Sequence, residues 1–89
     1  MERLKWNIGL EEYYSNEHIV NRSMWLYTDE QHPVEDRNKN EYKISQIAAD
    51  NFVLLIGTFC PHNKIIFERS YDTLRSAQKY GEMLYLLSK

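Results

Sequence analysis

Two stretches in the last third of the chain carry the clearest pattern of apolar positions. Residues 52–59 are almost continuously apolar. Because successive side chains of a strand point to opposite faces, such a run predicts a strand that needs cover on both faces. Residues 64–69 form a second apolar run, and the Cys60-Pro61-His62-Asn63 segment between the two predicts a turn. Together the two runs predict a β-hairpin.

Weaker patterns predict three further strands. Residues 4–10 alternate between apolar and polar or small positions, with the apolar side chains at Leu4, Trp6, Ile8 and Leu10. Residues 22–28 predict a second strand and residues 42–49 a third, which ends at the turn formers Asp50 and Asn51. Residues 11–20 show no clear period, and we favour a loop or a single helical turn there. The pattern predicts an α+β fold, with an antiparallel sheet of four or five strands in meander order.

The C-terminal segment predicts an amphipathic helix packed across one face of that sheet. Thr73 or Asp72 is expected to cap it, because their side-chain oxygens can accept hydrogen bonds from the free backbone N–H groups of the first helical turn. Advancing about 100° per residue from Leu74 defines the arc expected to face the sheet, which holds Ala77, Tyr80, Gly81, Leu84 and Leu87. Met83 and Leu86 fall outside this arc, so the end of the helix is expected to be apolar nearly all round.

One helix can cover only one face of a sheet whose central strand is apolar on both. If it covers the face of Phe52, Leu54 and Ile56, the other face carries Val53, Leu55, Phe59 and Ile66, with Trp25 or Tyr27 beside them. Leaving one such side chain exposed forgoes about 1.5–3 kcal/mol of burial. We expect the cover to come from the N-terminal segment folding back, from a homodimer, or from another protein. Exposed apolar residues at the helix end favour an intermolecular contact.

Charge is segregated along the chain, which has 89 residues and is expected to form a single domain. Residues 29–41 carry two basic and five acidic side chains, whereas the whole chain has a formal net charge of −2. This segment predicts a solvated acidic loop that could steer a basic partner surface. The rest is nearly neutral, so charge favours neither a strongly electropositive nucleic-acid binder nor a nucleic-acid mimic. One cysteine, no secretory signal and no membrane-spanning run lead us to expect a cytoplasmic protein without membrane contact.

Motifs for chemistry are sparse. Cys60 and His62 are too few ligands for a structural zinc site, and as a nucleophile and base for a hydrolase they lack an orienting third residue. The acidic loop lacks the alternating ligands and the glycine of a calcium loop, and the chain has no glycine-rich phosphate loop. We therefore expect no enzymatic activity, no catalytic residue, no metal and no cofactor.

The hypothesis that remains is a small non-enzymatic protein-binding module, acting as an inhibitor or adaptor. Its expected contact residues are Trp25, Tyr27, Asp29, Glu30, Glu35, Asp36, Met83 and Leu86. A short, motif-poor, tyrosine-rich chain is similar in style to accessory proteins of viruses or mobile elements, which act on host proteins such as a nuclease or a defence complex in the host cytoplasm. No residue motif carries that likeness, and no family is claimed. The alternative is a nucleic-acid-binding or regulatory domain that uses Arg22, Trp25, Tyr27 and Lys43 on the sheet.

Overall fold

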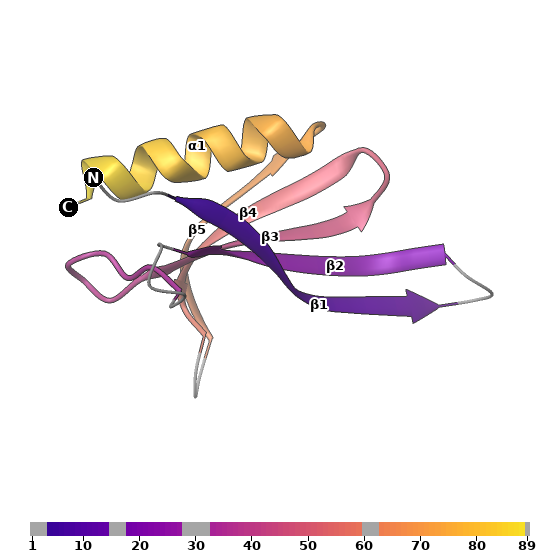
Figure 1. The fold of residues 1–89 in the computed structure, drawn as a ribbon, viewed down its shortest axis with the longest axis horizontal. Coiled ribbons are helices and arrows are strands. Elements are labelled where there is room, and N and C mark those ends of the chain that lie inside the picture. The colour runs from indigo at the N-terminus through magenta and orange to yellow at the C-terminus, as the bar shows by residue number, and fades with distance from the viewer. Residues whose placement is uncertain (1–3, 15–17, 28–32, 60–62, 89) are drawn as a thin grey trace.

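The computed structural model describes residues 4–14, 18–27, 33–59 and 63–88, which form one five-stranded antiparallel sheet and one helix (Figure 1). The strands are β1 (Lys5–Tyr14), β2 (His18–Tyr27), β3 (Glu41–Ala48), β4 (Asn51–Thr58) and β5 (Lys64–Tyr71), and the helix is α1 (Leu74–Leu87). The order of strands in the sheet is the order in the chain, β1-β2-β3-β4-β5. The α+β meander expected from the sequence is confirmed, with five strands.

The hydrophobic core lies between α1 and the face of the sheet that it crosses, over β3, β4 and β5 (Figure 1). Ile44 of β3 stands opposite Leu54 of β4, so both side chains point to the helix, and both are fully buried. Phe52 and Ile56 lie two residues to either side of Leu54 and are buried on the same face. The buried apolar residues are Met24, Leu26, Val34, Tyr42, Ile44, Phe52, Leu54, Ile56, Ala77 and Tyr85.

The loop or helical turn expected over residues 11–20 is wrong for the described part of this segment. β1 continues to Tyr14, β2 begins at His18, and the two strands pair antiparallel as far as these residues. Strand pairing satisfies backbone N–H and C=O groups, so a segment without apolar alternation becomes a strand when a neighbouring strand is available. The recorded pairing of β2 with β3 covers only Arg22 to Trp25. The far ends of β1 and β2 therefore project beyond the sheet as a two-stranded arm (Figure 1).

The described part of the N-terminal segment does not fold back over the second face of the sheet. β1 is an edge strand, and Leu4 and Trp6 pack against the core on the helix side. The Trp6 ring lies so close to Gly81 of α1 that a β-carbon on Gly81 would come within 3.0 Å of it. Of the three sources of cover expected from the sequence, this first one is not found for residues 4–14.

Thr73 caps the N-terminus of α1, and it is one of the two caps that the sequence predicts. Its Oγ1 accepts the backbone N–H of Ser76 at 3.2 Å, which satisfies one of the free amides of the first turn. At the other end, the backbone N–H of Ser88 donates to the carbonyls of Leu84 and Tyr85. Within the described ranges, no helix is both long enough and apolar enough to cross a membrane.

The buried side of α1 differs in two positions from the arc expected from the sequence. Ala77 and Gly81 are buried as predicted, and Tyr85 is buried as well. Leu87, which we placed on the arc, is 73% exposed. At about 100° per residue, Tyr85 lies only about 20° from Leu74, whereas Leu87 lies about 140° away. The inward side of the last turn is therefore aromatic, and the last leucine faces outward.

Candidate protein-binding surface

The face of the sheet opposite α1, which we call the open face, carries a row of apolar and aromatic side chains. Strand register places Trp25 beside Lys43, Lys43 beside Leu55, and Leu55 beside Glu68. Trp25, Lys43 and Leu55 are half-buried, and no described element of the chain packs over this face. The other apolar residues assigned to it by strand alternation are Tyr27, Val53, Phe59 and Ile66. The second face expected from the sequence is therefore present, and no described helix or strand packs over it.

Three side chains form a cluster at the centre of the open face. The Trp25 and Phe59 rings meet edge to face, with centroids 4.9 Å apart and planes at 90°. The Lys43 ammonium lies 5.1 Å from the Trp25 centroid and 5.3 Å from that of Phe59. A cation over an aromatic face contributes about 0.5–1 kcal/mol at an exposed site. These contacts shield each ring partly from water, which explains why Trp25 and Phe59 are half-buried without a covering element.

Asp36, one of the expected contact residues, is buried and is the hydrogen-bond acceptor for several groups of residues 38–42. Its carboxylate accepts the backbone N–H groups of Asn38 and Asn40, at 2.9 Å and 3.0 Å. It also accepts the side-chain amide of Asn40 and the hydroxyl of Tyr42, the latter at 3.1 Å. Burial alone would raise the pKa of Asp36, but these hydrogen bonds outweigh burial and hold the pKa below the usual 3.8. The carboxylate is used within the loop, whereas its neighbour Glu35 is exposed.

Glu41 and Glu35 form an acidic margin beside the open face. Glu41 begins β3 and is half-buried, two residues before Lys43. Burial and, after it, the nearby charge of Glu35 raise the pKa of Glu41 above its ordinary value of 4.5. A basic group of a partner would relieve this repulsion. The acidic residues Asp29 and Glu30, also expected to contact a partner, lie outside the described residues.

Replacing Glu41 with glutamine should raise the free energy of unfolding near neutral pH. The Glu41 carboxylate is disfavoured in the folded state, so its destabilising effect develops as pH rises from 4.5 through the raised folded-state pKa. Below 4.5 the carboxyl group is protonated in both states, and the two proteins should be equally stable. Urea unfolding across this range measures the difference. Glu35→Gln, which removes only the neighbouring charge, should have a smaller effect, and destabilisation by Glu41→Gln at neutral pH would contradict the assignment.

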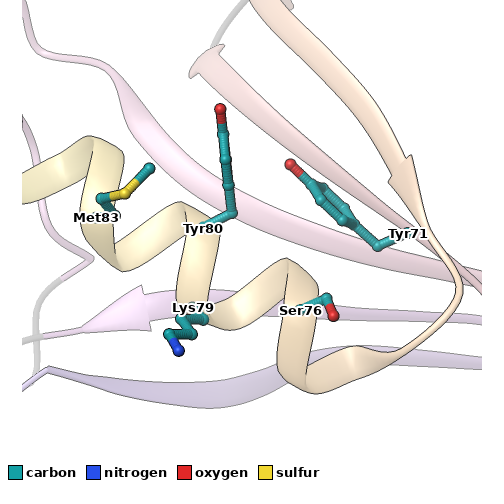
Figure 2. Close-up of a pocket in the computed structure, with 5 residues that line it drawn as sticks. All are labelled: Tyr71, Ser76, Lys79, Tyr80 and Met83. Atoms are coloured by element: carbon teal, nitrogen blue, oxygen red, sulfur yellow. The ribbon is translucent and has the colours of Figure 1, made fainter.

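The two expected contact residues of α1 are both exposed, but only one of them lines a pocket. Leu86 is 58% exposed and does not line the pocket described next. Met83 is 43% exposed and lines a pocket of about 360 Å³ between α1 and the end of β5. Tyr71 of β5 and Tyr80 of α1 form its walls (Figure 2). Ser76 and Lys79 complete the lining, and the Lys79 side chain runs away from the two tyrosine rings (Figure 2).

Metal binding finds no support among the residues with described positions. No group of three or more His, Cys, Asp or Glu side chains there is arranged to hold a metal ion. Cys60 and His62, weighed above as metal ligands or as a nucleophile and base, lie outside the described residues, so those readings stay untested.

The sequence did not predict the pocket, and it named Lys43 only for the nucleic-acid alternative, not as the centre of the aromatic cluster. Both depend on which strands lie next to each other, because Lys43 meets Trp25 and Phe59 only across the sheet. A partial signal for the pocket does exist in the helix. Ser76, Tyr80 and Met83, which line the pocket, recur every three or four positions, which puts them in a second stripe along α1.

Comparison of the chain with protein-family models, with curated proteins and with solved structures finds no match.

Proposed function

We propose that this chain is a small non-enzymatic protein-binding module that docks a partner protein on the open face of its sheet. The observation that supports the proposal is the apolar and aromatic character of that face, over which no described element packs. Ile66 of β5 is 59% exposed, and strand alternation puts it on the same face as the half-buried cluster of Trp25, Lys43 and Phe59. Exposed apolar surface of this kind on a small protein commonly marks an interaction site.

The residue types of the open face suit a protein interface. Trp and Tyr provide large contact areas and dominate the binding energy of many interfaces. Lys43 lies at the centre of the apolar residues, and Glu35 and Glu41 lie at one margin. A partner with apolar side chains at the centre and a basic group at that margin would be complementary. Full burial of one aliphatic or aromatic side chain contributes about 1.5–3 kcal/mol, so a few contacts can support stable binding.

The proposal extends to how such a module acts. With protein binding as its activity, the chain serves as an inhibitor or adaptor, in the manner of accessory proteins that viruses or mobile elements direct at a host nuclease or defence complex in the cytoplasm. A second copy of the chain is the other candidate occupant of the open face, which would make the protein a homodimer.

The test is affinity capture from the native source with quantitative mass spectrometry, using paired variants. Lys43→Glu and Ile66→Ser alter the open face, and each should reduce recovery of the partner at least about tenfold, as expected for central interface positions. Arg75→Glu on the exposed side of α1 and Ile8→Ser on the helix side of the sheet, where Ile8 is 52% exposed, are the matched controls and should retain it. No retained protein, or equal recovery with all four variants, would refute docking on this face.

Nucleic-acid binding is the alternative, and Lys43 beside Trp25 and Phe59 is the feature that favours it. Against it, Glu41 lies close by, and the Trp25 and Phe59 rings pack edge to face on each other rather than as a stack. Phosphate contacts are strongest at low salt. Binding of DNA or RNA that appears at low salt, weakens as salt rises, and is lost in Lys43→Glu would establish the alternative.

A further inference from the structure

The edge of the sheet formed by β5 lies next to the pocket and is open to another strand. β5 is the last strand of the sheet and pairs with β4, so among the described residues no strand lies beside the other side of its backbone. A register shift between Ile56 and Gly57 leaves Ile66 as an extra residue in β5, whereas Phe67 to Tyr71 pair regularly with β4. An unpaired strand edge is a template for a further strand. The regular five-residue part is therefore where a strand could be added.

The pocket lies on the helix side of this same part of β5. Phe67 stacks on Tyr80 of α1 with centroids 6.4 Å apart, and Tyr71 approaches Tyr80 at 5.8 Å. In Figure 2, the Tyr71 ring points from the end of β5 toward Tyr80, and Met83 lies on the other side of Tyr80. Residues directly opposite in an antiparallel pair share a face. An added strand would thus direct every second side chain toward Tyr80 and Met83.

The polar groups around the pocket are donors. Arg69 lies between Phe67 and Tyr71 on the helix face, and its guanidinium carbon is 5.7 Å from the centroids of both Tyr71 and Tyr80. None of the pocket-lining residues is acidic. The hydroxyl oxygen of Tyr71 is buried and has no hydrogen-bond partner among the described residues. Burial also raises the pKa of Tyr71, which keeps the hydroxyl protonated and able to donate. The complementary ligand carries an acceptor of negative charge beside apolar groups.

We propose that β5 binds an extended segment of a partner protein as a sixth strand, through an acidic side chain opposite Arg69 and apolar side chains two residues to either side. The backbone of β5 supplies affinity, and the pocket between Tyr71, Tyr80 and Met83 selects the apolar side chains. The acidic side chain pairs with Arg69 across the strands. This site deepens the proposed protein-binding function but is separate from the open face, because it lies at the edge of the sheet and on its helix side.

The probe is a seven-residue peptide with blocked ends and the sequence Thr-Phe-Thr-Glu-Thr-Phe-Thr, titrated to millimolar concentration into the isotopically labelled full chain. We expect its addition to shift the NMR signals of Phe67 to Tyr71, Tyr80 and Met83. A control peptide with Lys in place of Glu should bind at least about fivefold more weakly, as expected for exchanging an attractive cross-strand charge pair for a repulsive one. Unchanged β5 signals, or equal binding of the two peptides, would overturn the proposal.

A charge exchange gives the sharper test. Arg69 is exposed, so Arg69→Glu should fold normally, and it should reverse the preference so that the Lys peptide binds more tightly than the Glu peptide. Lys43→Glu on the open face should leave peptide binding unchanged while it removes the partner of that face, so failure of one site is distinguishable from failure of the other. Sedimentation and amide hydrogen exchange of the free chain are the last check. A concentration-dependent dimer that protects the β5 amides would mean that a second copy occupies the edge, which would overturn the proposal.

Discussion

Replacing Asp36 with alanine should lower the free energy of unfolding by about 2–4 kcal/mol near neutral pH, because its hydrogen-bond donors lose a charged acceptor and each buried donor left unpaired costs about 1–3 kcal/mol. The Asn40 backbone N–H is the most affected, since Asn40 is buried with Asp36. The Tyr42 hydroxyl loses less, because it keeps a hydrogen bond to Ser88, whose Oγ lies 3.3 Å away. Urea unfolding measures the change.

The Asp36 effect should depend on pH in a defined direction. The folded-state pKa of Asp36 lies below the ordinary value of 3.8, so its stabilising contribution is complete above 3.8 and is lost as pH falls through the lower folded-state pKa. Wild type and Asp36→Ala should therefore converge in strong acid. Glu35→Ala is the matched control, because Glu35 is adjacent but exposed, and it should change stability by no more than about 0.5 kcal/mol. Equal destabilisation by the two variants would mean that loop charge, not the hydrogen bonds, is responsible.

Replacing Gly57 with alanine should destabilise the protein by about 2–3 kcal/mol, at the upper end of what overpacking usually costs. A β-carbon at this position would come far inside contact distance of the Lys64 carbonyl oxygen and within 2.9 Å of the Ile65 Cα. Both are backbone atoms of β5, so relief requires the strand itself to move. Thermal unfolding monitored by circular dichroism is the measurement.

Gly81→Ala is the control for loss of a glycine as such. Its β-carbon would meet side-chain atoms of Trp6 and Leu54 at 3.0–3.1 Å, which can give more readily than backbone. Alanine also gains about 1 kcal/mol over glycine in a helix interior. The net change should stay within about 1 kcal/mol. If Gly57→Ala proves as mild as Gly81→Ala, the close contact between β4 and β5 is not rigid.

Alternation of apolar residues was enough to predict the strands that build the core. The continuous run around Leu54 predicted a strand with two apolar faces, and the pattern around Thr73 predicted the start of α1. The arm formed by β1 and β2 was missed because Glu11-Glu12-Tyr13-Tyr14 has no alternation, and only its pairing with β2 extends it as a strand. Long-range pairing of this kind is not encoded in the local pattern.

The candidate binding residues were harder to predict than the fold, for two physical reasons. Composition counted Asp36 among the solvated acids, but its role comes from local hydrogen bonds that place the carboxylate against backbone N–H groups. Arg69 and Tyr71 are ordinary strand residues in the sequence, and they meet Tyr80 only because α1 returns alongside β5. The pattern of apolar residues therefore predicts which side chains must be buried. Which polar groups come into contact depends on how the elements pack in three dimensions.

Tyr42 couples two parts of the chain that are far apart in sequence. Its hydroxyl faces the carboxylate of Asp36 in the loop and the hydroxyl of Ser88 at the end of α1, 46 positions away from Tyr42. The Tyr42 ring also packs edge to face on Tyr85, with centroids 5.6 Å apart. The segment 36–42 and the C-terminal end of α1 therefore share one hydrogen-bonding group. Local opening of the last helical turn should therefore loosen the segment around Asp36 as well.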